Sequence, residues 1–419
     1  MLNFKIDTSE IDKIGNFDKK EKDFRLKNLE YFNKTGFPNK RSEDWKFSDL
    51  RDIVSKNFKR LSFNYTDIVE KKFDLITEFE HNFIILTNGE LTSSNFNYED
   101  KDKIKIEKYS SNSLPDKVDP NPLINLNHAM ANKGFQLEVK NNYKFNKILV
   151  IYSLYTDKLS ENILNCRNKI KIGKNSELHT LEYLINDSKD NFFNNICESI
   201  ILDDSATYKN ICIQKRKSAG YFHKYSNNKL GINSSFSSFI FPAGLKFNKL
   251  DLEFDLNGKN SECKLLAASY LDQKDHQEIK TRINHFAPDC KSFQKVKKVL
   301  DSESKGIFQG KIYVKDEAQK TDAYQLSKAI LLNDSSEFNS KPELEIYADD
   351  VKCSHGSSSG NIDENSVFYL MSRGLSKKES INLLIDGFLS EITDEIKSQT
   401  IKTFVINRLK IQLDGHKKH

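Results

Sequence analysis

The sequence predicts a mainly β chain with a core of stacked coils between two helical ends. Short apolar runs punctuated by Gly, Asn and Asp follow one another from about residue 135 to residue 350. A turn pattern recurs inside that stretch, and helical periodicity is concentrated outside it. We therefore expect an N-terminal helical or mixed region at 1–134, a β core at 135–350 and a C-terminal helical region at 351–419.

The N-terminal region is expected to contain helices and at least one strand. Residues 18–34 space phenylalanines and a leucine among charged residues, as in an amphipathic helix, and Gly36 marks its end. The run NFIILTNGEL at 82–91 predicts a strand that ends in an Asn-Gly turn. Residues 122–134 are expected to form a short helix that ends near its glycine.

The β core carries an internal repeat. GKNSEL at 173–178 and GKNSEC at 258–263 are near-identical, and DDSATY at 203–208 resembles both. Each string lies between two apolar runs, where a turn with Gly or Asn in the left-handed conformation would start a new strand. This favours stacked coils, as in a β-solenoid. A coincidence of a Lys-, Asn- and Ser-rich composition, or a sandwich or barrel, stays open on pattern alone.

The C-terminal region reads as helical. Asp363 can cap a helix that runs to residue 373. Ser376 and Glu379 form a capping box, in which each side chain satisfies a free backbone N–H of the other. An apolar stripe then predicts a last helix over about 396–409. Such helices can cover an exposed edge of a solenoid or dock a partner.

Composition excludes several classes of function. The net charge is +5, and basic residues, 56 of them Lys and 9 Arg, are interspersed with acidic ones. This is typical of a solvated surface and not of a nucleic-acid interface. No stretch approaches the roughly 18 apolar residues that cross a membrane, and no secretory signal opens the chain. Six scattered cysteines without a C-x-x-C pair fit free thiols in a reducing cytoplasm.

One dense cluster carries chemistry, in DDVKCSHGSSSG at 349–360. Cys353 and His355 are two residues apart, so in an extended strand both side chains point to the same face. A thiolate and an imidazole can bind a soft or borderline metal such as iron or zinc, but two ligands are too few for a closed site. The alternatives are a buried Cys beside a hydrogen-bonded His and a Cys–His nucleophile pair.

The remaining candidates are weaker. A phosphate loop is not found: GIFQGKI at 306–312 has too few residues between its glycines and lacks the Ser or Thr for magnesium. We expect no ATP hydrolysis by this chain alone. Trp45 is interpreted as a core anchor. The histidines of the core are interpreted as structural or surface residues: His179, His223, His276 and His285.

Three strings resemble the SufB/SufD family of the Suf iron–sulfur assembly machinery. They are the segment 341–380, which contains DDVKCSHG, the segment GIFQGKIYVKDEAQKTDAYQ at 306–325, and FPNKRSEDWKFSDL at 37–50. The last string matches the family through Pro38, Glu43, Trp45, Lys46 and Phe47. The DDVKCSHG string, and the lack of the extra cysteine-rich segment of SufB-like chains, point to the SufD branch. One departure is the serine run 357–359; its side chains are small, so a tight turn could still form there.

The resemblance implies a right-handed parallel β-helix and a complex with SufB and two SufC ATPase subunits. SufB would pair near the C-terminal end of the β-helix, the helices of 351–419 would dock SufC, and SufC would hydrolyse ATP. A nascent iron–sulfur cluster would form at the SufB interface, with His355 as the iron-binding or cluster-supporting residue facing a cysteine of SufB. Cys353 is a neighbouring candidate. A reduced flavin has been proposed for this complex, and the isolated chain could form a homodimer.

Three functions therefore compete. The first is a non-catalytic scaffold subunit for iron–sulfur cluster assembly, or a SufB-like paralogue in the same pathway. The second is a carbohydrate-active enzyme on a β-helix, although such enzymes are commonly secreted and carry carboxylate or basic clusters along one face. The third is a structural solenoid in which Cys353 and His355 matter only for stability.

Overall fold

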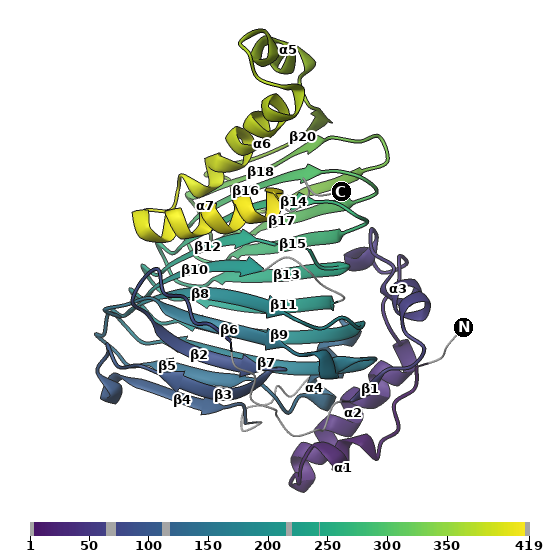
Figure 1. Ribbon diagram of the computed structural model, residues 1–419. Helices are drawn as coiled ribbons and strands as arrows, with labels where there is room; N and C mark the ends of the chain where they lie inside the picture. Colours follow the sequence, from purple (N-terminus) through teal and green to yellow (C-terminus); the bar gives the residue numbers. More distant parts are fainter. Residues whose placement is uncertain (1–3, 64–72, 111–117, 215–219, 243, 415–419) are drawn as a thin grey trace.

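The computed structural model describes residues 4–63, 73–110, 118–214, 220–242 and 244–414 (Figure 1). Its core is a parallel β-solenoid made of two facing sheets. Sheet 1 contains β4 (Ile104–Lys108), β5 (Phe135–Val139), β7 (Asn162–Ile172), β9 (Phe192–Leu202), β11 (Gly220–Leu230), β13 (Phe247–Leu256), β15 (His276–His285), β17 (Lys305–Val314) and β19 (Glu337–Ile346), with β1 (Ser62–Phe63) beside β7.

Sheet 2 contains β3 (Glu90–Asn95), β2 (Asn82–Thr87), β6 (Leu149–Tyr155), β8 (Glu177–Asn186), β10 (Thr207–Gln214), β12 (Ser235–Phe241), β14 (Glu262–Leu271), β16 (Lys291–Leu300), β18 (Thr321–Leu331) and β20 (Val351–Asn361). From β6 to β20 the chain alternates between the two sheets, and each strand pairs in parallel with the strand one coil later. The expected mainly β fold with a parallel β-helix core is confirmed.

The helices lie at the two ends of the chain. The N-terminal ones are α1 (Glu10–Ile14), α2 (Lys19–Thr35), α3 (Leu50–Asn57) and α4 (Pro122–Met130). The C-terminal ones are α5 (Glu364–Ser372), α6 (Lys377–Thr393) and α7 (Gln399–Asp414). Short 3-10 turns occupy Glu43–Trp45, Lys101–Lys103 and Asp157–Leu159. No helix of the described ranges combines the length and apolar character that a membrane crossing requires.

The repeated turn strings lie at one corner of the solenoid. In each, the third residue has a positive φ: 57° at Asn175, 57° at Ser205 and 59° at Asn260. The backbone N–H of each donates to a carbonyl of the next coil, at 3.1 Å for Asn175 and 2.7 Å for Ser205. Asn233, Asp289 and Lys320 continue this ladder. The prediction of stacked coils is confirmed, and the left-handed residue is the predicted Asn in two of the strings and Ser205 in the third.

Other local predictions are also confirmed. Asn88 and Gly89 both have positive φ and join β2 to β3 as an antiparallel hairpin. The capping box of Ser376 and Glu379 opens α6, and Asp363 caps α5. The sheets, however, reach beyond the expected range of 135–350, because β2, β3 and β4 precede it and β20 follows it.

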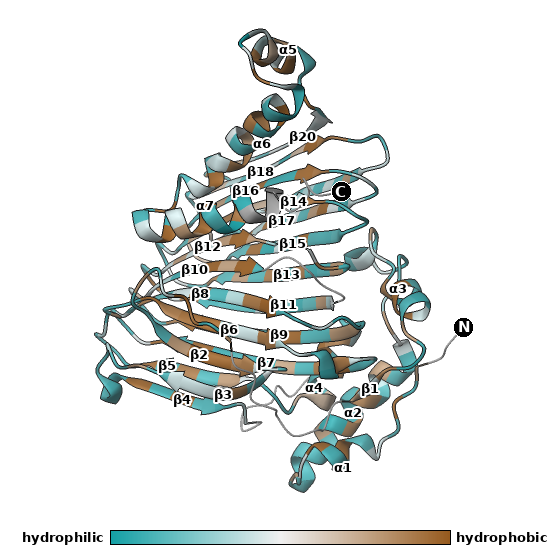
Figure 2. Ribbon diagram, viewed as in Figure 1, coloured by the Kyte–Doolittle hydropathy of each residue, from teal (hydrophilic) through white to brown (hydrophobic). Residues whose placement is uncertain are grey.

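Apolar residues recur along the strands of both sheets (Figure 2). The buried ones form a core between the two sheets. The outer faces are covered by different ends of the chain. The N-terminal helices pack on sheet 1, against Phe193, Tyr221 and Phe247. α6 and α7 pack on the outer face of sheet 2, through Ile385 and Phe404 among others. These two helices therefore cover a face of the solenoid and not the edge of its last strand.

Trp45 anchors the N-terminal segment to the outer face of sheet 1. Its ring is 1% exposed and stacks on Phe247, with the Lys249 Nζ 4.5 Å from the ring centroid. Lys249 is itself fully buried and ion-paired with Glu278. Glu43 pairs with Lys341 on β19, the last strand of sheet 1. Trp45 is thus a core anchor, as expected, and it ties residues 43–48 to the outside of sheet 1.

The histidines of the core are structural. His223 and His285 are fully buried, and each ring makes one hydrogen bond, to Asn195 at 3.0 Å and to Ser292 at 2.9 Å. Burial lowers the pKa of His223 to about 3 and that of His285 to about 4. Both rings are therefore neutral in the folded chain at a pH where the unfolded chain would protonate them.

We expect these two histidines to lower the free energy of unfolding as the pH drops from about 6.5 toward 4, since in that window they are protonated in the unfolded chain and neutral in the folded one. Each such histidine contributes up to about 1.4 kcal/mol per pH unit. His285→Gln should reduce this slope by the contribution of one histidine, measured by urea unfolding at several pH values. An unchanged slope would mean that His285 is protonated in the folded chain as well.

Candidate functional site

The solenoid is open at its C-terminal end. β20 is the last strand of sheet 2 and pairs with β18 on one side, and β19 is the last strand of sheet 1. Within the described residues no strand pairs with the other edge of either one. The side chains of β19 are mostly half-buried and those of β20 mostly exposed, unlike the buried inner faces of the coils below. An open coil with unpaired backbone groups is a surface suited to pairing with another chain.

Both predicted site residues lie on β20, on the face that looks into the solenoid. Cys353 is in register with Ala323 of β18, and His355 is in register with Gln325. Ala323 and Gln325 are each 1% exposed, so their line faces the interior. Because side chains alternate along a strand, Cys353 and His355 share this face. The expectation that the two point the same way therefore holds in the structure.

Cys353 is half-buried. It packs against a small apolar cluster that contains Ile312 and Ala323. Burial, reinforced by Asp322, raises the pKa of the Cys353 thiol. A nucleophilic cysteine needs a lowered pKa. The raised pKa therefore disfavours a Cys–His nucleophile pair. A metal or a partner cation would have to stabilise the Cys353 thiolate.

His355 is exposed, and its ring has no hydrogen-bond partner among the residues that the structure describes. This disagrees with the alternative of a hydrogen-bonded structural histidine. Across the described ranges, no group of three His, Cys, Asp or Glu side chains is placed to hold a metal ion. Cys353 and His355 are thus two donors at an open end, with free space where further ligands would sit.

The serine run is part of the strand. Ser357, Ser358 and Ser359 all belong to β20, so the run is extended and does not form the tight turn that its small side chains would allow. The Ser357 hydroxyl accepts from Ser327 at 3.0 Å, and Ser327 is 2.7 Å from Ser340 of β19. These contacts link the two sheets across the open end. The run extends the inward-facing line of Cys353 and His355 with small hydroxyl side chains.

A second surface lies beyond the open end. α5 projects past β20 and contacts α6 (Figure 1). Large apolar side chains are exposed on these two helices, and we call them the C-terminal apolar patch: Phe368 (73% exposed), Tyr369 (56%), Met371 (42%) and Leu383 (51%). Exposed apolar groups at this density are typical of an interaction surface. The sequence analysis had placed this helix but not identified which of its residues stay uncovered.

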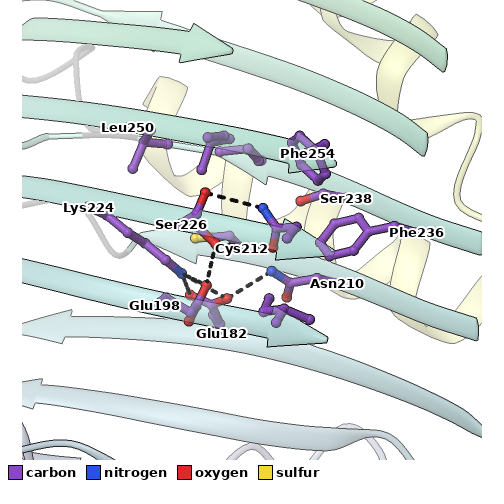
Figure 3. A pocket seen from close by; sticks show the side chains of 14 residues that line it. Glu182, Glu198, Asn210, Cys212, Lys224, Ser226, Phe236, Ser238, Leu250 and Phe254 are labelled. Carbon is purple, nitrogen blue, oxygen red and sulfur yellow. Dashed lines mark hydrogen bonds and ion pairs between the residues drawn. The ribbon is translucent and has the colours of Figure 1, made fainter. Parts of the chain in front are cut away.

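An interior cluster of charges was missed by the sequence analysis. Glu182, Glu198 and Lys224 meet inside the solenoid beside a cavity of about 40 Å³ (Figure 3). The Lys224 Nζ lies 3.0 Å from Glu182 and 2.9 Å from Glu198. Asn210 donates to Glu182 at 2.8 Å and Ser226 donates to Glu198 at 3.2 Å. Only the stacking register of β8 to β11 brings these residues together.

This cluster is internally paired. Burial raises the pKa of Glu198, and the pKa of Lys224 is well above its ordinary value because Glu182 and Glu198 outweigh the opposing effect of burial. Burial also raises the pKa of the neighbouring Cys212 thiol. The cavity has room for water and not for a substrate. We therefore interpret the cluster as part of the fold.

Removal of the Lys224 charge should show how much the stability of the fold depends on this cluster. Lys224→Met leaves two carboxylates in the interior without their cation, and we expect a loss of about 3–5 kcal/mol in the free energy of unfolding. Lys209→Met is the matched control, because Lys209 pairs with Glu177 at the surface, 3.2 Å away, and should cost less than about 1 kcal/mol. Urea unfolding of both variants checks this. Equal losses would contradict the interpretation.

Comparison with known proteins identifies the family of the chain. Residues 155–388 match the family model for the SufBD core domain of the SUF system for FeS cluster assembly. The iron–sulfur cluster assembly protein SufD of Escherichia coli is 22% identical over 390 residues, 92% of each chain. A SufBD family protein of Synechocystis is 25% identical and covers 86% of this chain and 84% of its own. SufD of Bacillus subtilis is 27% identical over 70% of this chain and 67% of its own. The chain belongs to the SufB/SufD family of iron–sulfur cluster assembly proteins.

Proposed function

We propose that this chain is a non-catalytic scaffold subunit of the Suf iron–sulfur cluster assembly complex, where it pairs with SufB and docks the SufC ATPase. Family membership supports a role in the Suf pathway and favours this function over a carbohydrate-active enzyme. The finer assignment rests on the open end of the solenoid. In this proposal SufC binds and hydrolyses ATP, and the nascent cluster is the product of the complex. We assign no residue of this chain to a reduced flavin.

The observation that carries the proposal is the position of Cys353 and His355. Both lie on the inward-facing line of the last strand, at an end where no strand follows in the described chain. Thiolate and imidazole are suitable ligands for iron, but the two need further donors. SufB, paired at this end, would supply them. A partner that adds ligands would also cover the unpaired edges of β19 and β20.

The pairing mode follows from the same edges. Exposed backbone N–H and C=O groups of β20 can extend a sheet into another chain. In the absence of SufB, we expect the same edges to pair two copies of this chain. The proposal places the complex in the cytoplasm because all six cysteines are free thiols, which suits a reducing compartment.

The SufC dock is assigned to the C-terminal apolar patch. α6 and α7 use their buried faces to hold sheet 2, which leaves α5 and the exposed side of α6 for a partner. Phe368 is the most exposed large apolar residue of the patch, at 73%. Aromatic side chains of this kind commonly contribute most to the affinity of an interface. Movement of a SufC subunit on this patch would be transmitted through α6 to sheet 2.

His355→Ala should abolish cluster assembly without preventing the complex from forming. The chain is co-expressed with its cognate SufB and SufC, the complex is isolated, and iron and acid-labile sulfide are counted. We expect at least about a tenfold loss of both in the variant, since a ligand is removed. His179→Ala is the control, because His179 lies on β8 away from the open end and bonds to Glu177. Equal iron and sulfide in the native and His355→Ala complexes would overturn the assignment of His355, and a native chain that recruits neither partner would overturn the scaffold role.

Phe368→Asp should weaken SufC binding and leave SufB binding intact. A charge in the centre of the apolar patch is expected to cost at least about 2 kcal/mol of binding free energy. Phe286→Asp is the control, since Phe286 is 37% exposed but lies next to β15, on the opposite sheet. Calorimetric titration of SufC into each purified variant measures the effect. If only the control variant loses SufC, the dock lies on sheet 1.

A further inference from the structure

Gln325 is the side chain directly below His355. The two residues are in register on β18 and β20, and in-register neighbours in a parallel sheet lie about 4.8 Å apart. They share the inward face, as the hydrogen bond between Ser327 and Ser357 two residues further along shows. A glutamine side chain spans that separation easily. The carboxamide of Gln325 is therefore the inward-facing polar group that lies in register with His355 on the neighbouring strand.

The Gln325 carboxamide is buried and only half satisfied. The residue is 1% exposed, and its Nε2 donates to the Gly310 carbonyl at 3.4 Å. A side chain at position 310 would collide with the Oε1, so the glycine makes room for the carboxamide as it crosses toward β17. The Oε1 itself has no hydrogen-bond partner among the described residues. A buried acceptor without a donor is costly and points to a donor that arrives from elsewhere.

One internal donor competes for this oxygen. Gln294 on β16 is in register with Gln325, one coil further from the open end. Its Oε1 accepts from Thr281 at 2.6 Å, and its Nε2 is also without a partner. A Gln294–Gln325 amide pair would serve the fold alone. On the other side of Gln325, the residue in register is His355 of β20. His355 has a ring N–H to donate and no partner of its own in the described chain.

We propose that Gln325 is a positioning residue for His355. Its carboxamide oxygen accepts one ring N–H of His355 when a partner covers the open end, which leaves the other ring nitrogen free to bind iron. Histidines that bind a metal regularly donate their second N–H to an oxygen acceptor, which fixes the tautomer and the ring orientation. The role rests on the proposed function of His355 and adds a residue that neither sequence motif nor family membership assigned.

Two substitutions separate the acceptor from the donor of the carboxamide. Gln325→Met keeps the length of the side chain and removes both groups. Gln325→Glu keeps an oxygen acceptor for His355 but removes the N–H that bonds to Gly310. If Gln325 acts on His355, Gln325→Met lowers the iron and sulfide of the SufB- and SufC-containing complex by tenfold or more, and Gln325→Glu restores most of it. A role confined to the Gly310 contact predicts that both variants fail alike.

Gln294→Met is the matched control, since it removes the same group from the same column one coil away. It should lower the melting temperature and leave iron and sulfide per assembled complex unchanged. The proposal is overturned if His355→Ala loses its iron while Gln325→Met keeps it, if Gln294→Met loses as much as Gln325→Met, or if both Gln325 variants fail to join the complex. If His355→Ala keeps its iron, the proposed function fails first and the role of Gln325 fails with it.

Discussion

The in-register stacking of parallel coils is the constraint on which the rest of this structure depends. Each strand from β6 to β18 satisfies its backbone groups with the strands one coil before and one coil after it. This works only if every coil turns at the same place. The left-handed residues at one corner, from Asn175 to Lys320, fix that place, because each donates its backbone N–H to the coil above.

Stacking also aligns side chains into columns. Apolar columns form the core, while polar residues in the same lines meet their counterparts one coil away. Glu182, Glu198 and Lys224 meet in this way and form an ion-paired interior cluster. At the last coil, inward-facing polar side chains have a neighbouring coil on one side only. Cys353 and His355 occupy inward-facing positions, but no further coil covers them in the described chain.

The helices account for which surfaces remain available. The N-terminal segment with Trp45 covers the outside of sheet 1, and α6 and α7 cover the outside of sheet 2. The end of the solenoid and the C-terminal apolar patch are left uncovered. These two uncovered surfaces match in number the two partners that the proposed function requires.

Much of the fold followed from local sequence. Period-2 strands, the Asn-Gly hairpin at 88–89, the capping box at Ser376 and the recurring turn string are short-range signals, and short-range physics decides them. The same-face geometry of Cys353 and His355 needs only an extended backbone, so two residues of spacing predicted it. The resemblance to the family supplied what such signals cannot, namely a partner and a role.

The tertiary structure decided everything that depends on register. The serine run at 357–359 could form either a turn or a strand on sequence alone, and pairing with β18 holds it in β20. Glu182, Glu198 and Lys224 are far apart in the chain, and no periodicity marks them as neighbours. Gln325 lies beside His355 for the same reason, since a coil of 30 residues separates them in sequence and one strand spacing separates them in space. Sequence by itself determines which segments form strands, turns and helices, because those choices are local. Which side chains meet depends on the length of each coil, because that length sets the register between strands, and only the folded chain shows this register.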